Sequence, residues 1–429
     1  MKSIFSAHKP LSGEVRVPGD KSIGHRALML GALARGGLII RSLPPGLDVR
    51  STRSCLETLG ARVTHSKDEI LIEGNTAHSP LRAPGRALDC GNSGTTMRLL
   101  AGMLSGWGFD SILTGDSSLS ARPMGRVAVP LREMGAEISL SAGDTAPIRL
   151  RGKRPLKALR HKLHVPSAQV KSALLLAALS GEGESVVEDP FSTRDHTERM
   201  LAWMKARISV ERETIRLNPG DLEGGRTLTV PADPSSAAFF LAAAVLVEGS
   251  ELTLPGVCVN PTRMGFVHVL REMGAQVAEV GAREEGGEPV ADLSASFGGL
   301  RAVRVAAERI PSLVDEVPLL AVVASQAEGE TRLMGLAELR HKESDRLSTT
   351  LAALHAMGVK ARTEGEDLLI EGPCRLRGAA VETRSDHRIA MAFAVAGLIA
   401  QGETALSDAE CAAISYPGFF SDLERCTGR

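Results

Sequence analysis

The chain has 429 residues, and its 50 Lys and Arg residues nearly balance its 51 Asp and Glu residues, which gives a formal net charge of -1. With no basic excess and only 3% aromatic residues, the composition does not favour a protein that binds nucleic acid through phosphate contacts and base stacking. The length exceeds one ordinary hydrophobic core, so we expect two domains. Six cysteines without C-x-x-C pairs indicate the reduced thiols of a cytoplasmic protein rather than a zinc or disulfide framework.

The first predicted element is a polar turn, Pro18-Gly19-Asp20, followed by an apolar helix over residues 21–34. Asp20 or Ser22 can cap this helix by accepting a hydrogen bond from a backbone N–H. Lys21, Ser22 and Arg26 lie in or next to its first turn, where free N–H groups and the helix dipole favour an anion. The pattern predicts a phosphate or carboxylate site, although a capped helix with two solvated cations shows the same residues.

The same pattern of a small-polar or proline turn and an Ala/Leu-rich helix recurs at a spacing of about 65 to 80 residues. The further copies cover residues 90–104, 166–178, 231–247, 310–324 and 385–400. A second repeat runs in phase with it: an amphipathic helix ends near Gly60, Gly135, Gly274 and Gly358, with a weaker copy around residues 200–208. Short alternating segments, such as residues 69–73 and 367–371, follow as strands.

Each unit therefore reads as strand, helix, strand, helix, strand, strand, with one buried and one outer helix. Residues 282–288 are charged and contain glycine, and we expect them to form a solvated loop.

Two further segments point to anion binding. Gly91 to Arg98 combines small residues with the start of a helix and exposes N–H groups, as a plain glycine-rich turn also does. Arg122 precedes Pro123, which fixes the chain there, so its guanidinium could bind a carboxylate or phosphate at two points.

Eight motifs occur in one order along the chain: PGDKS-x-x-HRA, GNSGTT-x-R, GD-S-S-L-x-x-RPM, PSAQVKSALLLAAL, TRDHTERM, DPSSAAFFLAAA, LRHKESDRL and SDHRIAMAF. Together they resemble the 5-enolpyruvylshikimate-3-phosphate (EPSP) synthase family over residues of about 10 to 420. HKESDRL and TRDHTERM look more like the bacterial subgroup that includes glyphosate-tolerant members. The resemblance implies a two-domain inside-out α/β barrel, the enolpyruvyl transferase fold, with six βαβαββ repeats, three per domain. Residues 1–20 and 231–429 would form one domain and residues 21–230 the other, with the active site in the interdomain cleft.

The resemblance also implies the reaction and its residues. Phosphoenolpyruvate would add to the 5-hydroxyl of shikimate 3-phosphate and then lose phosphate, with no metal or redox cofactor. The implied catalytic residues are Lys21, Asp315 and Glu343. Those for shikimate 3-phosphate are Lys21, Ser22, Arg26, Ser167, Ala168, Gln169, Arg194, Asp315 and Lys342. Those for phosphoenolpyruvate are Lys21, Gly94, Arg122, Gln169, Arg346 and Arg388.

Some of these residues also fit simpler interpretations. Asp315 could be only a helix cap, and Lys342 to Arg346 could be only a solvated charge run. The sequence also departs from the family pattern, because Ile414 stands where many members have a lysine that contacts phosphoenolpyruvate. Gly94 lacks the methyl group that the tolerant subgroup often has at this position, so glyphosate is expected to inhibit the enzyme.

Two other functions remain open at this point. UDP-N-acetylglucosamine enolpyruvyl transferase shares the fold, but its family has a reactive cysteine in the loop that here spans residues 115–123 without a thiol. A non-catalytic sugar-phosphate binder would keep the anion sites and lose the acid–base residues. We expect a monomer that uses small-molecule substrates and neither nucleic acid nor a membrane.

Overall fold

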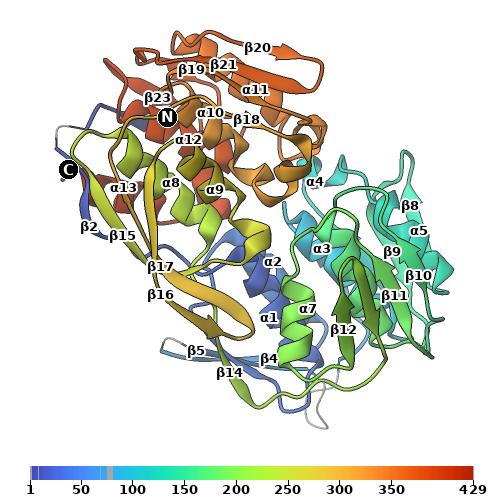
Figure 1. The fold of residues 1–429 in the computed structure, drawn as a ribbon. Helices are drawn as coiled ribbons and strands as arrows, with labels where there is room; N and C mark the ends of the chain where they lie inside the picture. The colour runs from blue at the N-terminus through green and yellow to red at the C-terminus, as the bar shows by residue number, and fades with distance from the viewer. Residues whose placement is uncertain (1, 8, 68, 75–80, 429) are drawn as a thin grey trace. The chain divides into compact units, whose positions relative to one another are not determined.

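The computed structural model describes residues 2–7, 9–67, 69–74 and 81–428. Contacts divide the chain into two units (Figure 1). Unit 1 comprises Met1–Pro18, Pro231–Arg283 and Pro289–Arg429, and unit 2 comprises Gly19–Val230 and Glu284–Glu288. Within the described ranges each unit holds three separate sheets, each four-stranded except one of three strands in unit 1. None of the helices described there is both long and apolar enough to cross a membrane.

Unit 2 consists of three repeats of strand, helix, strand, helix and β-hairpin. In each repeat the first two strands pair in parallel, and the hairpin pairs antiparallel with the second strand. The first repeat is β14 (Arg226–Thr229), α1 (Lys21–Leu33), β3 (Leu38–Arg41), α2 (Leu47–Thr58), β4 (Arg62–Ser66) and β5 (Glu69–Glu73). The second is β6 (Leu88–Asp89), α3 (Gly94–Ser105), β7 (Asp110–Thr114), α4 (Ser117–Ser120), α5 (Gly125–Glu133), β8 (Glu137–Ser141) and β9 (Thr145–Arg151). The third is β10 (Arg160–Lys162), α6 (Ala168–Ala178), β11 (Ser185–Glu188), α7 (His196–Trp203), β12 (Ile208–Glu211) and β13 (Thr214–Leu217).

Unit 1 has the same plan, and its N-terminal strands complete two of the repeats. One is β2 (Ser12–Glu14), α8 (Pro234–Leu246), β15 (Glu251–Cys258), η1 (Pro261–Arg263), α9 (Gly265–Glu272), β16 (Gln276–Glu285) and β17 (Glu288–Ser296). The next is β18 (Arg304–Val305), η2 (Ala307–Ser312), η3 (Val314–Glu316), α10 (Val317–Ala324), β19 (Gly329–Leu333), η4 (Ala337–His341), α11 (Arg346–Ala356), β20 (Ala361–Glu364) and β21 (Asp367–Gly372). The last is β22 (Ala380–Val381), α12 (His387–Gly397), β23 (Thr404–Leu406), η5 (Glu410–Ile414) and α13 (Phe419–Thr427), where β1 (Lys2–Ile4) pairs with β23 in place of a hairpin.

One helix of each repeat lies in the core of its unit. Helices α1, α3 and α6 pack in unit 2, and α8, α10 and α12 pack in unit 1. Every residue of α8 is buried, which is the expected position for a helix that is apolar on all sides. The predicted α/β repeats with a buried and an outer helix are therefore confirmed, and the sheets that flank the helices are separate rather than one closed barrel.

The outer helices end as their glycines predict. Gly60, Gly135, Gly274 and Gly358 have φ angles of 95°, 101°, 99° and 88°, in the left-handed region that glycine adopts without a steric penalty. In the weaker copy Lys205 takes this place with a φ of 61°. The repeat is thus kept in the backbone even where the sequence signal fades.

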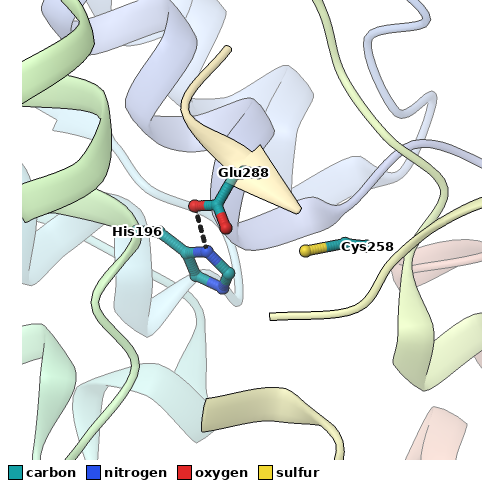
Figure 2. A group of neighbouring side chains, drawn as sticks. All are labelled: His196, Cys258 and Glu288. Atoms are coloured by element: carbon teal, nitrogen blue, oxygen red, sulfur yellow. Dashed lines mark hydrogen bonds and ion pairs between the residues drawn. The ribbon is translucent and has the colours of Figure 1, made fainter. Parts of the chain in front are cut away.

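The prediction of a solvated loop at residues 282–288 is right about solvent for Ala282, Arg283 and Glu284, which are exposed, and wrong about the loop and about Glu288. Strand β16 continues to Glu285 and β17 begins at Glu288, so the turn is only Gly286 and Gly287. The Glu288 side chain is buried and accepts a hydrogen bond of 2.7 Å from Nδ1 of His196 on α7, also in unit 2 (Figure 2). A carboxylate with a buried imidazole partner does not need solvent, and charge composition alone could not show that partner.

Substituting Gly102 by alanine is expected to destabilise the protein by about 1–3 kcal/mol, because it overpacks the contact between α3 and α6. A Cβ atom at Gly102 would lie 2.1 Å from the carbonyl oxygen of Ala173, and a backbone atom cannot move aside cheaply. Helix propensity alone would give the opposite sign, since alanine is favoured over glycine by about 1 kcal/mol. Urea unfolding of Gly102→Ala checks this, with Gly108→Ala as control because a Cβ there meets nothing within 4 Å. A stabilised Gly102→Ala protein would contradict the close packing.

Candidate functional site

Nine of the predicted site residues lie in unit 2: eight lie in or next to the first two turns of the buried helices α1, α3 and α6 or just before α7, and Arg122 lies between α4 and α5. We name them the unit 2 cluster: Lys21, Ser22, Arg26, Gly94, Arg122, Ser167, Ala168, Gln169 and Arg194. Asp20, Ser93 and Ser167 cap the three helices by accepting hydrogen bonds from backbone N–H groups. Each cap satisfies one N–H group and leaves the positive end of the helix dipole for an anion.

Lys21 is held by a buried carboxylate. Its Nζ atom donates to Oδ2 of Asp48 on α2 at 2.9 Å, and the Thr96 hydroxyl of α3 donates to the Asp48 carbonyl at 3.3 Å. Asp48 therefore ties the starts of α1 and α3 together. His25 lies below this point, where burial, followed by the charges of Lys21 and Arg26, holds its pKa well below the usual value. His25 is therefore neutral and buried, and its Nδ1 atom lies 2.7 Å from Oγ1 of Thr52.

Arg26 is held by three hydrogen bonds within unit 2. Its guanidinium donates to Oγ1 of Thr197 and Oγ of Ser172, both at 2.7 Å, and to the carbonyl of Ser22 at 2.8 Å. Burial, with the nearby charge of Arg194 adding to it, lowers the pKa of Arg26 to about 10. A guanidinium whose charge is disfavoured by burial and by a neighbouring cation is stabilised when an anion binds to it.

Gly94, Gln169 and Arg122 lie around one residue that the sequence analysis did not single out. Arg98 donates to Oε1 of Gln169 at 2.6 Å and to the carbonyl of Pro123 at 3.1 Å. Nε2 of Gln169 donates to Thr95 at 2.9 Å, so both ends of this amide are fixed. A Cβ atom on Gly94 would lie 2.8 Å from Nη1 of Arg98 and 3.5 Å from Nη1 of Arg122.

Arg122 is largely buried and donates to Oδ1 of Asn92 at 2.7 Å, which agrees with the prediction of a held arginine. Arg98 was visible as the last residue of the GNSGTTMR motif, but only the fold shows that it contacts Gln169, 71 positions along the chain.

The remaining five predicted residues lie in unit 1, and we name them the unit 1 cluster: Asp315, Lys342, Glu343, Arg346 and Arg388. Arg346 opens α11 and is 1% exposed, so the interpretation of residues 342–346 as a solvated charge run is wrong for it. Its guanidinium donates to Asp386 at 2.8 Å, to Asp315 at 3.3 Å and to Glu343. Burial alone would lower the pKa of Arg346, but these three carboxylates more than offset it and hold the pKa above its usual value.

Asp315 is not a helix cap. It lies in the 3-10 turn η3 just before α10, and α10 has no side-chain cap. Its Oδ1 atom lies 3.3 Å from Nη1 of Arg346 and 3.8 Å from Nζ of Lys342, and its side chain is 17% exposed. Asp315 is therefore a carboxylate set between two cations with one edge accessible.

Arg388 and Ile414 lie in the last repeat of unit 1. Arg388 is the second residue of α12. Its side chain is buried, and its Nη1 atom lies 3.8 Å from Oε1 of Glu316. Asp386 caps this helix and also pairs with Arg346. One buried carboxylate therefore holds both the backbone N–H of Arg388 and the guanidinium of Arg346. Ile414 lies at the end of η5 and brings no charge to the cluster.

The family model of EPSP synthase (3-phosphoshikimate 1-carboxyvinyltransferase) matches residues 5–423. The chain belongs to the EPSP synthase family. It is 49% identical to the 3-phosphoshikimate 1-carboxyvinyltransferase of Anaeromyxobacter sp. (strain Fw109-5), over 97% of this chain and 96% of that relative. It is 46% identical to the enzyme of the same name from Chloroflexus aurantiacus (strain ATCC 29366 / DSM 635 / J-10-fl), over 99% of this chain and 98% of that relative.

Solved structures support the same family. The EPSP synthase from Acinetobacter baumannii is 42% identical, with a TM-score of 0.87, over 99% of this chain and 97% of that one. The enolpyruvyl transferase NikO from Streptomyces tendae is 20% identical with a TM-score of 0.78, which shows a shared fold. The predicted family and the enolpyruvyl transferase fold are confirmed.

Proposed function

We propose that this chain transfers the enolpyruvyl group of phosphoenolpyruvate to the 5-hydroxyl of shikimate 3-phosphate and releases phosphate. Relatives that cover 97–99% of this chain at 44–49% identity have the name 3-phosphoshikimate 1-carboxyvinyltransferase. The observation that carries this proposal is the set of groups that this fold holds in place. Unit 2 has helix N-termini and cations with fixed partners, and unit 1 has carboxylates paired with buried arginines. Anions and proton transfer are what this addition–elimination needs.

In unit 2 we assign the 3-phosphate to Ser22, Ser167, Ala168 and the guanidinium groups of Arg26 and Arg194, with Gln169 shared between the two substrates. Lys21, Gly94 and Arg122 would hold phosphoenolpyruvate. The depressed pKa of Arg26 supports this assignment, because the bound dianion would offset the cost of keeping two guanidinium groups together.

In unit 1 we assign Asp315 to the proton of the 5-hydroxyl and Glu343 to proton exchange at the methylene carbon, with Lys21 of unit 2 as its partner. Lys342 would bind shikimate 3-phosphate, and Arg346 and Arg388 the anionic groups of phosphoenolpyruvate. The contacts of Arg346 with both Asp315 and Glu343 support a shared task. That the two clusters act on one pair of substrates, in a cleft between the domains, stays a prediction.

The test is the initial rate of phosphate release from phosphoenolpyruvate with shikimate 3-phosphate or UDP-N-acetylglucosamine as acceptor. Release with shikimate 3-phosphate alone is expected. Release with the nucleotide sugar alone would favour the sister transferase, which the names of the relatives do not support. Binding of shikimate 3-phosphate without release in either case would favour a non-catalytic binder.

We also propose that glyphosate inhibits the enzyme, although two motifs resemble the subgroup with tolerant members. Gly94→Ala is expected to raise the glyphosate inhibition constant by at least about tenfold and the KM for phosphoenolpyruvate by only a few fold. The new methyl would lie beside the ends of Arg98 and Arg122, where a longer ligand has less room. Inhibition titrations of the two proteins check this, with Gly108→Ala as control. An unchanged inhibition constant would contradict the steric explanation.

A monomeric state and a cytoplasmic location are proposals of the same kind. Sedimentation velocity at several protein concentrations tests the first, and fractionation of the source cells tests the second.

A further inference from the structure

A fully buried ionic triad in unit 2 lies outside the predicted site. Lys171 of α6 is 2% exposed, and its Nζ atom lies 2.8 Å from Asp189 and 2.7 Å from Glu198 of α7, each 4% exposed. The two carboxylates raise the pKa of Lys171 above its usual value although burial lowers it, so the ammonium stays charged. Such a triad adds little to the free energy of unfolding compared with apolar packing of the same volume, so stability alone does not account for it.

The triad fixes the residue that precedes Arg194. Lys171 donates to the carbonyl of Thr193 at 3.1 Å, and Asp189 accepts from the Thr193 N–H at 2.9 Å and hydroxyl at 2.7 Å. Lys171 and Asp189 thus engage the carbonyl, the N–H and the hydroxyl hydrogen of Thr193. The turn needs this support, because Ser192 has a φ of 48° in the left-handed region.

The neighbouring residues on the same two helices fix Arg26. Ser172 follows Lys171 on α6, and Thr197 precedes Glu198 on α7. These two hydroxyls accept from the guanidinium of Arg26, and the Thr197 hydroxyl donates to that of Ser172 at 2.7 Å. One contact between α6 and α7 therefore sets the backbone before Arg194 and the side chain of Arg26.

We propose that Lys171 is a positioning residue for the phosphate of shikimate 3-phosphate: through Asp189 and Thr193 it holds Arg194 at a fixed place relative to Arg26. This rests on the proposed function. Lys171 itself is too buried to touch the substrate. Its effect is on the contact with the phosphate group and not on the ring hydroxyls, so it sets the preference for shikimate 3-phosphate over shikimate.

Isothermal titration calorimetry tests this with shikimate 3-phosphate and with shikimate, each without phosphoenolpyruvate. The variants are Lys171→Met, which keeps the stem and removes the ammonium, and the matched pair Thr193→Val and Thr193→Ser. We expect Lys171→Met to weaken shikimate 3-phosphate binding by at least about tenfold and shikimate binding by less than about twofold. The preference is the ratio of the dissociation constant of shikimate to that of shikimate 3-phosphate. Thr193→Val should lower this ratio by at least about threefold, and Thr193→Ser should retain it.

A folded Lys171→Met protein that keeps the wild-type preference, or that loses both ligands in the same proportion, would overturn the proposal. If Lys171→Met does not fold because two carboxylates lose their partner, the Thr193 pair decides: equal preferences in Thr193→Val and Thr193→Ser overturn it. Wild-type protein that binds shikimate 3-phosphate but never releases phosphate would instead contradict the proposed function, and the comparison of preferences would still hold.

Discussion

Arg346→Met is expected to lower kcat/KM for phosphoenolpyruvate by at least about a hundredfold and to destabilise the protein by about 3–5 kcal/mol. The guanidinium is buried and is shared by Asp315, Glu343 and Asp386. Removing it leaves the fully buried Asp386 without its main cation and frees Asp315 and Glu343 from their common partner. Urea unfolding and steady-state kinetics measure the two effects. Arg346→Lys should recover part of the stability and little of the activity. Lysine restores the positive charge, but its compact ammonium does not reproduce the planar guanidinium that contacts all three carboxylates.

Arg340→Met is the matched control. Arg340 is 35% exposed and pairs with Asp345 and Glu366 at the surface, so its removal should change the free energy of unfolding far less than removal of Arg346 and leave kinetics unchanged. Equal losses for the two arginine variants would contradict the importance of burial at Arg346. A stable Arg346→Met protein with normal phosphoenolpyruvate kinetics would remove Arg346 from the site.

Glu343→Gln and Asp315→Asn are each expected to lower kcat by about 10²–10⁴-fold, the usual contribution of a general acid or base. The amides keep an oxygen that accepts from Arg346, so binding of both substrates should change only a few fold. Separate measurement of kcat and of the substrate dissociation constants distinguishes lost chemistry from lost structure.

Glu366→Gln serves as control, since this carboxylate is exposed and pairs only with Arg340 among the described contacts. If Glu343→Gln and Asp315→Asn both kept kcat within about threefold, neither residue would move a proton in the reaction. The non-catalytic binder would then regain support only if the wild-type protein also released no phosphate.

Much of the fold was predictable because its signals are local. Six apolar helices after small-polar turns, and outer helices ending at glycine, follow from capping and from the left-handed backbone that glycine allows. The weaker copy at residues 200–208 shows the limit, because Lys205 adopts that backbone without being glycine. Local sequence signals also did not predict the N-terminal strands β1 and β2, because their partners β23 and β15 lie far along the chain.

The candidate site was predictable as residue types at helix starts, and the partners that hold them were not. Asp48 under Lys21, Arg98 on Gln169 and Asp386 between two arginines are contacts between segments distant in sequence. The same reason explains the error at residues 282–288. Charge and glycine content predict an exposed loop, whereas the Glu288 carboxylate is buried and hydrogen-bonded to the imidazole of His196. Burial of a charge depends on its partner, and only the fold supplies the partner.

Mass spectrometry of the products formed from shikimate 3-phosphate and phosphoenolpyruvate tests the central claim most directly, together with the phosphate released. We expect one enolpyruvyl ether of shikimate 3-phosphate for each phosphate released, and neither product when one substrate is omitted. Phosphate without the ether would show only hydrolysis of phosphoenolpyruvate, and an ether formed only with UDP-N-acetylglucosamine would identify another acceptor. Either result would contradict the proposed reaction.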